Sequence, residues 1–262
     1  MSVIQTNNVK LSGNGDKTMV FVHGYGCDQN MWRFVAPAFE DTYRTVLFDQ
    51  VGAGGSDRSG YDKAKYSTLD GYAEDVVAIG RELGLKKAIF VGHSVSAMIC
   101  MLASLKAPEM FETLVMVAPS ACYINEDDYY GGFTQEQIEL LLETLEDDFM
   151  GWSHSMAPLM MGNADRPELG LELANSFCRA DPEIAKAFAR VTFTSDNRAE
   201  LSGVKTRSLI FQCSEDIIAS EKVGKYLHDH LPNSELILLK ATGHCPNLSA
   251  PTELIAAIKA HV

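Results

Sequence analysis

The chain has 262 residues, which suits one large domain with a substantial hydrophobic core. Its 35 Asp and Glu residues outnumber 22 Lys and Arg, and the formal net charge of −13 disfavours a nucleic-acid partner. The opening sequence MSVIQTNNVKLSGNGDK lacks the features of a signal peptide, and no apolar run approaches the ~20 residues of a membrane span. We therefore expect a cytoplasmic protein that does not bind membranes.

The six cysteines are spread along the chain without a Cys-x-x-Cys pair. This spacing favours reduced, mostly buried thiols over a disulfide framework or a zinc site. The histidines also lack metal-ligand spacing, because His228 and His230 would point to opposite faces of a strand and would pair poorly on a helix. We expect no metal.

Short apolar segments rich in β-branched residues alternate with helical patterns of about 10 to 15 residues, which is typical of βα units and a parallel sheet. Apolar residues between positions 69 and 80 and between positions 254 and 258 recur at helical intervals, the second group after Pro251. The predicted strands cover residues 18–23, 45–49, 88–91, 114–117, 208–212 and 235–239.

The strand pattern stops between about residues 120 and 198. The segments QEQIELLLETLEDDFMGW, ELGLELANSFC and PEIAKAFARVTF all have helical patterns, and strands resume only at SLIFQ. We therefore predict a core made of residues 1–119 and 199–262, interrupted by a helical cap over residues 120–198.

The stretch GHSVSAM, residues 92–98, lies between a predicted strand and a predicted helix. It resembles the Gly-x-Ser-x-Gly nucleophile elbow, in which a serine on a strained turn exposes its hydroxyl. Ser96 replaces the last glycine, but its small side chain keeps the elbow plausible. The alternative is that Ser94 is only a polar residue at a turn.

A nucleophilic serine requires a general base and a third group that orients the base. In α/β hydrolases an acid and then a histidine follow the serine along the chain. Asp216 and His244 each follow a predicted strand, and the carboxyl ends of parallel strands meet at one edge of a sheet. The order therefore predicts a triad of Ser94, His244 and an acid that is either Asp216 or the adjacent Glu215.

Acyl transfer also needs two N–H donors aimed at the developing oxyanion, each worth on the order of 3 kcal/mol. The residue after the nucleophile, Val95, would supply one amide. The loop HGYG, residues 23–26, would supply the second through Tyr25, unless HGYG is merely a turn.

Longer segments point to a particular family. HGYGCDQNMW, LFDQVGAGGSD, LDGYAEDV, FVGHSVSAMI, LASLKAPEMF, CYINEDDYYGGF and GHCPNLS together resemble the RsbQ-like α/β hydrolases, bacterial regulators of the general stress response. The same segments resemble the related plant karrikin and strigolactone receptors. The resemblance covers residues 9–262. GHSVS resembles the plant receptors, whereas GCDQ and CYINEDDYYGGF resemble the bacterial proteins, so we expect the bacterial branch.

The resemblance implies an α/β-hydrolase fold with a mostly parallel sheet, a triad of Ser94, Asp216 and His244, and the oxyanion amides named above. The acyl-transfer chemistry of such a triad requires no cofactor. It also implies a closed, apolar pocket beneath a V-shaped cap of four helices. Tyr25 and Met156 stand where relatives often have phenylalanine, which would change what fits in the pocket. The implied lining residues are Tyr25, Tyr123, Phe133, Trp152, Met156 and Phe193.

These observations predict a serine hydrolase that cleaves a small, largely apolar ester or lactone through an acyl-enzyme. The alternative is a ligand sensor, in which binding or slow hydrolysis shifts the cap and alters a surface read by a stress-pathway phosphatase. A haloalkane dehalogenase is disfavoured because its elbow nucleophile is a carboxylate, whereas this chain has Ser94.

Overall fold

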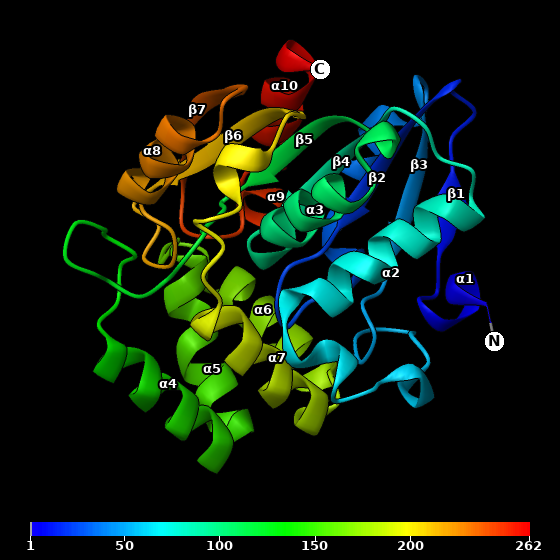
Figure 1. Cartoon of the computed structure of the whole chain (residues 1–262). Helices are drawn as coiled ribbons and strands as arrows, with labels where there is room; N and C mark the ends of the chain where they lie inside the picture. The colour runs from blue at the N-terminus through cyan, green and yellow to red at the C-terminus, as the bar shows by residue number, and fades with distance from the viewer. Residues whose placement is uncertain (1) are drawn as a thin grey trace.

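The computed structural model describes residues 2–262. A seven-stranded sheet with the order β1-β3-β2-β4-β5-β6-β7 runs through the molecule (Figure 1). Strands β2 to β7 pair in parallel, and β1 pairs antiparallel with β3. The predicted, mostly parallel sheet is confirmed. The strands are β1 (Lys10–Ser12), β2 (Lys17–Val22), β3 (Tyr43–Phe48), β4 (Ala88–His93), β5 (Phe111–Val117), β6 (Arg207–Ser214) and β7 (Ser234–Thr242).

Each predicted strand overlaps an observed one, and the observed strand β1 was not predicted. All three residues of β1, KLS, are exposed, so the segment has no apolar face that could signal a strand. Its pairing with β3 places it at the edge of the sheet (Figure 1).

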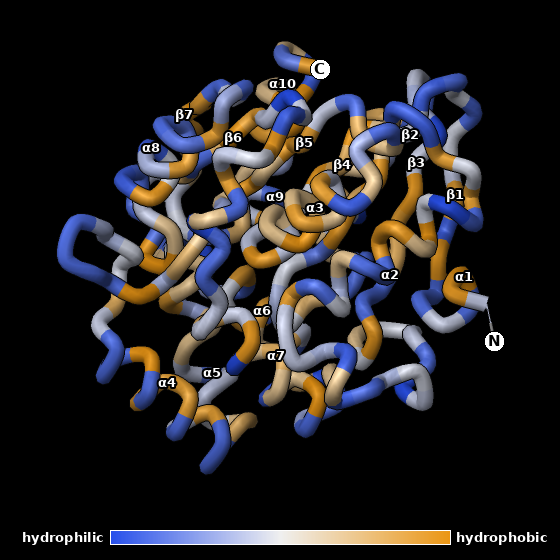
Figure 2. Tube along the Cα trace, viewed as in Figure 1, coloured by the Kyte–Doolittle hydropathy of each residue, from blue (hydrophilic) through white to orange (hydrophobic). Residues whose placement is uncertain are grey.

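Helices cover both faces of the sheet. In Figure 1, α2 (Leu69–Glu82), α3 (Val95–Lys106) and α8 (Glu221–His230) lie in front of the sheet, and α10 (Pro251–His261) lies behind it. Helix α3 is buried from Val95 to Ser104, because it lies between the sheet and α2. Figure 2 shows hydrophobic residues concentrated along α3 and β4 in the interior.

The remaining elements are short helices at the ends of strands and loops. They are α1 (Val3–Thr6), α9 (Pro246–Ser249) and the 3₁₀ helices η1 (Gln29–Trp32), η2 (Ala36–Phe39), η3 (Arg58–Gly60), η4 (Lys65–Ser67), η5 (Pro108–Met110) and η6 (Leu201–Gly203). Among residues 2–262, no helix combines the length and hydropathy needed to cross a lipid bilayer.

Four helices stand between β5 and β6, gathered below the sheet in Figure 1. The segment QEQIELLLETLEDDFMGW spans the first two of them, because Asp148 leaves the helical conformation and its side chain accepts a hydrogen bond from the Gly151 amide. Figure 2 shows hydrophilic and hydrophobic residues alternating along the outermost of the four. The helices are α4 (Gln135–Asp147), α5 (Phe149–Met161), α6 (Pro167–Arg179) and α7 (Pro182–Thr194).

The two segments that connect these helices to the sheet are tied together. Cys122 and Asp196 form an antiparallel bridge, and the Asn197 amide donates to the Ala121 carbonyl at 2.8 Å. The Arg198 guanidinium then binds the carboxylates of Asp196 and Glu126, at 2.6 Å each. The segments before and after the four helices therefore lie side by side where they join the sheet.

Candidate active site

Ser94 lies at the sharp turn between β4 and α3. Its backbone has φ 56° and ψ −127°, a conformation that costs a non-glycine residue roughly 1 to 3 kcal/mol. A Cβ at Gly92 would lie 2.5 Å from the Ser96 carbonyl oxygen, so only glycine fits there without a shift. The structure therefore shows the strained strand–turn–helix geometry that the sequence predicts for a nucleophile elbow.

Folding brings Ser94, His244 and Asp216 together, although they come from three separate loops. His244 Nε2 lies 2.8 Å from Ser94 Oγ, and His244 Nδ1 lies 2.8 Å from Asp216 Oδ2. The three residues are each at most 5% exposed. Glu215, the competing acid, is exposed, whereas Asp216 is the acid that contacts the imidazole of His244.

The partners of Asp216 define the tautomer of the neutral imidazole. Asp216 Oδ1 accepts hydrogen bonds from the Ile218 and Ala219 amides at 2.8 and 3.1 Å, which leaves Oδ2 to accept from His244. A carboxylate only accepts, so His244 Nδ1 carries the proton. The lone pair of His244 Nε2 therefore faces the hydroxyl of Ser94, as a general base requires.

The backbone of His244 is held on both sides. Its amide donates to the carbonyl of Met160, near the end of α5, at 2.9 Å. Its carbonyl accepts from His93 Nε2 at 2.8 Å. Burial, together with the neighbouring His244, lowers the pKa of His93 to about 3, so His93 is an uncharged donor at neutral pH. Sequence reasoning assigned no role to His93.

The two amides predicted to bind an oxyanion are available as donors. Val95 is the first residue of α3, where an N–H group has no partner within the helix. The Tyr25 amide donates no backbone hydrogen bond within residues 2–262. Free backbone N–H groups beside a nucleophile are what an oxyanion hole requires.

Ser94 opens onto a cavity of about 20 Å³, which is room for roughly one water molecule. Of the predicted lining residues, Tyr25, Tyr123 and Phe193 border it. The lining consists of Tyr25, Cys27, His93, Ser94, Tyr123, Met160, Leu173, Phe177, Thr192, Phe193, Ile218, His244 and Cys245.

The other three expected lining residues, Phe133, Trp152 and Met156, do not border this cavity. Trp152 packs against Phe177, which does border the cavity, and their ring centroids are 5.8 Å apart. On α5 the lining methionine is Met160, one helical turn after Met156. Phe177 and Leu173 of α6 were missed because a helical apolar face does not reveal which of its members meets a cavity.

Two hydroxyls at the cavity have no hydrogen-bond partner within residues 2–262. They are Tyr123 Oη and Thr192 Oγ1, and both residues are 1% exposed. Burial raises the pKa of Tyr123 to about 12, which keeps its hydroxyl protonated. The hydroxyl of Ser94 lies near Tyr123 and partly offsets this rise in pKa. An unmet buried hydroxyl costs about 1 to 3 kcal/mol, so Thr192 Oγ1 in particular favours a ligand with a polar atom.

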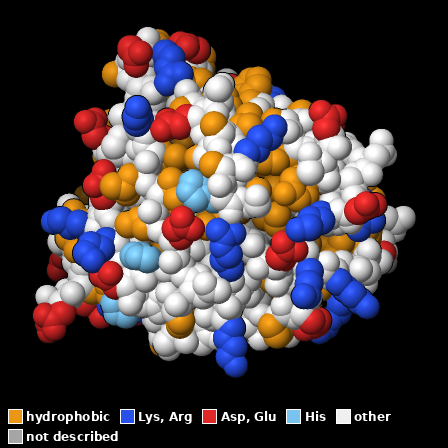
Figure 3. All heavy atoms as spheres, turned by 90° about the horizontal axis from the view of Figure 1, so that it is seen from above, with side chains coloured by type: hydrophobic (Ala, Val, Ile, Leu, Met, Phe, Trp, Pro, Cys, Tyr) orange, Lys and Arg blue, Asp and Glu red, His pale blue; other side chains and the backbone are white. Residues whose placement is uncertain are grey.

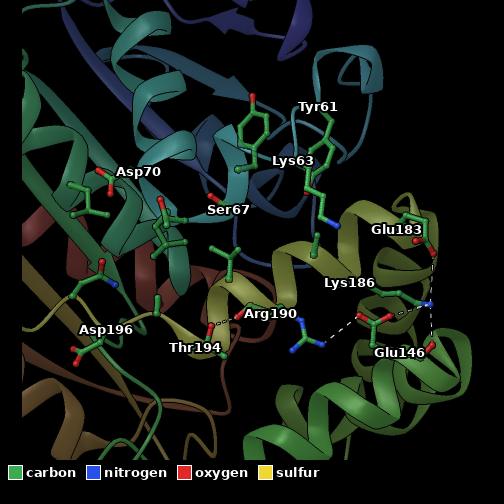
Figure 4. Close-up of a pocket in the computed structure, with 18 of the residues that line it drawn as sticks. Tyr61, Lys63, Ser67, Asp70, Glu146, Glu183, Lys186, Arg190, Thr194 and Asp196 are labelled. Carbon is green, nitrogen blue, oxygen red and sulfur yellow. Dashed lines mark hydrogen bonds and ion pairs between the residues drawn. The ribbon is translucent and has the colours of Figure 1, made fainter.

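A larger groove of about 690 Å³ lies between α7 and the segment around η4 (Figure 4). In Figure 4, Glu146 of α4 faces Lys186 and Arg190 of α7, and its carboxylate lies 3.7 Å from each. None of the triad residues lines this groove. Within residues 2–262, no cluster of His, Cys, Asp or Glu is arranged to hold a metal ion.

Comparisons with known proteins identify the family of the chain. The chain matches the family model described as alpha/beta hydrolase fold over residues 17–251. It is 38% identical to the karrikin insensitive 2 receptor CA of Petunia hybrida, across 99% of this chain and 97% of the relative. It is 36% identical to strigolactone esterase D14 of Arabidopsis thaliana, across 97% and 95% of the two chains.

Among solved structures, a hydrolase from Oleispira antarctica superposes with a TM-score of 0.96 at 40% identity, covering 98% of this chain and 95% of that chain. The predicted α/β-hydrolase fold and the predicted enzyme class, an esterase-type hydrolase, are confirmed. The RsbQ-like branch stays a prediction, because the similarity extends to plant receptors and to a bacterial hydrolase alike. The chain belongs to the alpha/beta hydrolase fold family.

Proposed function

We propose that the protein is a serine hydrolase that cleaves a small, largely apolar ester or lactone through an acyl-enzyme. The observation that carries this proposal is the chain of two 2.8 Å contacts from Ser94 Oγ through His244 to Asp216. The ester class is supported by the 36% identity with a strigolactone esterase. Apolar substrates are favoured because most cavity residues are aromatic or aliphatic.

In the proposed mechanism, His244 Nε2 takes the proton of Ser94 as Oγ attacks the substrate carbonyl carbon. The amides of Tyr25 and Val95 stabilise the oxyanion of the tetrahedral intermediate. His244 then protonates the leaving oxygen, and an acyl-enzyme remains on Ser94. Water, deprotonated by His244, attacks the acyl group and releases the acid and free Ser94. No step requires a cofactor.

We further propose that residues 120–198 act as a cap that opens to admit the substrate. The cavity of about 20 Å³ is far below the roughly 300 to 1,000 Å³ of ordinary ligand sites, so the described conformation is closed. Once the substrate is inside, the hydroxyls of Tyr123 and Thr192 would bind a second polar atom, such as another oxygen of a lactone.

The decisive test is the Ser94→Ala variant, assayed with activated esters such as p-nitrophenyl acetate and with butenolide-like lactones. We expect kcat to fall by at least about 1,000-fold, because the variant loses the hydroxyl that contacts His244 Nε2. Ser104→Ala is the matched control, since Ser104 is buried in the same helix and bonds only to the Met101 carbonyl. Full activity of Ser94→Ala, with a folded protein, overturns the mechanism.

We also propose a second function, RsbQ-like signalling. The 38% identity with a plant receptor supports a receptor role in general. In this alternative, ligand binding or slow hydrolysis shifts the cap, and a stress-pathway phosphatase reads the altered surface. Leu140, Leu159 and Leu171 of the cap helices are each more than half exposed and would be available to such a partner. Leu159→Gln should then change the phosphatase output without changing ester hydrolysis. An unchanged output in all three leucine variants counts against signalling.

The cellular setting we propose is a reducing, cytoplasmic one. All six cysteines are free, and five of them are buried. Free buried thiols are ordinary in reducing compartments and unusual in secreted proteins.

A further inference from the structure

A buried polar network connects the elbow with the loop that carries the Tyr25 amide. Ser96 is 0% exposed, His23 1% and Gln50 4%. The Ser96 hydroxyl donates to the His23 carbonyl and accepts from Gln50 Nε2 at 2.8 Å. Gln50 Nε2 also donates to the same carbonyl at 3.2 Å. The common elbow pattern has glycine at this position. Glycine has no side chain and could form neither of these two hydrogen bonds.

The network also defines the state of the His23 ring. The backbone amide of Gln50 donates to His23 Nε2 at 3.0 Å, so this nitrogen is the unprotonated acceptor. His23 Nδ1 therefore carries the proton and donates to the Gly24 carbonyl at 2.9 Å. Gln50 thus contacts His23 twice, through its main chain at the ring and through its side chain at the carbonyl.

Peptide geometry transmits these contacts to Tyr25. The Gly24 carbonyl and the Tyr25 N–H belong to one planar trans peptide group, in which they point in opposite directions. Holding the Gly24 oxygen therefore aims the Tyr25 N–H. The His23 carbonyl belongs to the preceding peptide, so the peptides on both sides of Gly24 are held. Gly24 itself is confined, because a Cβ there would lie 2.6 Å from His93 Nδ1.

We propose that Ser96 and Gln50 are positioning residues that orient the Tyr25 amide for oxyanion binding. This inference rests on the proposed serine hydrolase function, because it assigns the network a role in that reaction. A tilted amide would weaken binding of the tetrahedral oxyanion more than binding of the neutral substrate. Loss of the network should therefore lower kcat and leave KM almost unchanged.

The test compares Ser96→Ala, Gln50→Leu and the double variant with wild type. We expect each single substitution to lower kcat by about 10-fold to 100-fold, with KM changed by less than about twofold. A phenylboronic acid, which forms a tetrahedral anionic adduct on Ser94, should bind more weakly by the same factor as kcat falls. Because both side chains hold the same peptide, the double variant should lose much less than the product of the two single losses.

Ser104→Ala again serves as the control, because its hydroxyl bonds within α3 and does not reach the Tyr25 loop. Like Ser96→Ala, this variant removes one buried serine hydroxyl from α3. We expect it to keep the wild-type kcat and the wild-type affinity for the boronic acid. Ground-state binding is measured separately in proteins that cannot react. For this, the affinity of a neutral ester for Ser94→Ala is compared with its affinity for the Ser94→Ala, Ser96→Ala double variant.

Two results overturn the positioning role. One is a kcat and boronate affinity within twofold of wild type in both single variants. The other is an equal loss of boronate and neutral-ester affinity, which indicates a general structural effect. If Ser96→Ala does not fold, Gln50→Leu decides by the same two measurements. Failure of the proposed function itself looks different, because Ser94→Ala would then keep its activity and wild type would not bind the boronic acid.

Discussion

His93 is a buried side chain next to Ser94 that holds the backbone of His244. It donates to the carbonyl of His244 at 2.8 Å and is 2% exposed. Its Nδ1 has no partner within residues 2–262, so adding a proton there would create a buried charge without compensation. This explains why the pKa of His93 falls to about 3.

A pH dependence of stability follows from His93. Below its ordinary pKa of about 6.5, the unfolded state binds a proton that the folded state does not bind until about pH 3. The free energy of unfolding should therefore decrease as pH falls through this window, by up to about 1.4 kcal/mol per pH unit from this group. Urea unfolding of wild type and His93→Gln between pH 7.5 and 4 checks this, with the pH values taken at roughly one-unit steps.

The glutamine amide can still donate to the His244 carbonyl but cannot titrate in this range. The stability difference between the two proteins should be constant above about pH 7 and should shift in favour of His93→Gln as the pH falls. Parallel curves over the whole range would show that His93 does not have the lowered pKa.

At the scale of elements, the end of α5 and the loop after β7 are packed backbone against backbone. Gly243 has φ 76°, and a Cβ there would lie 1.9 Å from the Met161 carbonyl oxygen. The next residue, His244, bonds to the Met160 carbonyl. The position of the proposed general base therefore depends on contacts with α5.

Gly243→Ala should push the loop after β7 away from the end of α5, because the added Cβ would clash with the Met161 carbonyl. We expect a loss of roughly 2 to 4 kcal/mol in unfolding free energy, from the clash and from the left-handed backbone, and a fall of at least about 10-fold in kcat. Gly84→Ala is the matched control, because Gly84 also has a positive φ but no atom within 4 Å of the added Cβ. Similar losses in both variants would mean that the α5 contact contributes nothing.

For the molecule as a whole, burial decides which thiols can react. Cys178 is partly exposed and the other five cysteines are buried. Burial raises the pKa of Cys27 to about 12 and also raises that of Cys100 and Cys245, which keeps these thiols protonated and unreactive. Charged side chains of both signs are interspersed on the face that lies away from helices α4 to α7 (Figure 3).

We expect the native protein to react quickly with one equivalent of Ellman's reagent and the unfolded protein with six, matching its cysteine count. Cys178→Ser should remove the fast reaction. Rapid modification of two or more thiols in the native protein would contradict the closed packing around the cavity, which Cys27 and Cys245 line.

The amino-acid sequence by itself determined the parallel strands, the elbow and the order of Ser94, Asp216 and His244. These features follow from local periodicity and from the rule that loops at the carboxyl ends of parallel strands converge. The edge strand β1 was missed because its three residues carry no apolar pattern. The choice of Asp216 over Glu215 came from the family resemblance, and the contact with His244 agrees with it.

Only the tertiary structure decided which residues meet around the triad. His93 and His244 are 151 positions apart, and Gln50 and Ser96 are 46 apart, so no local pattern reveals their contacts. The same holds for the lining, where Met160 and not Met156 reaches the cavity. A helical pattern defines an apolar face, but the packing of that face against other elements decides which side chain borders the cavity at Ser94.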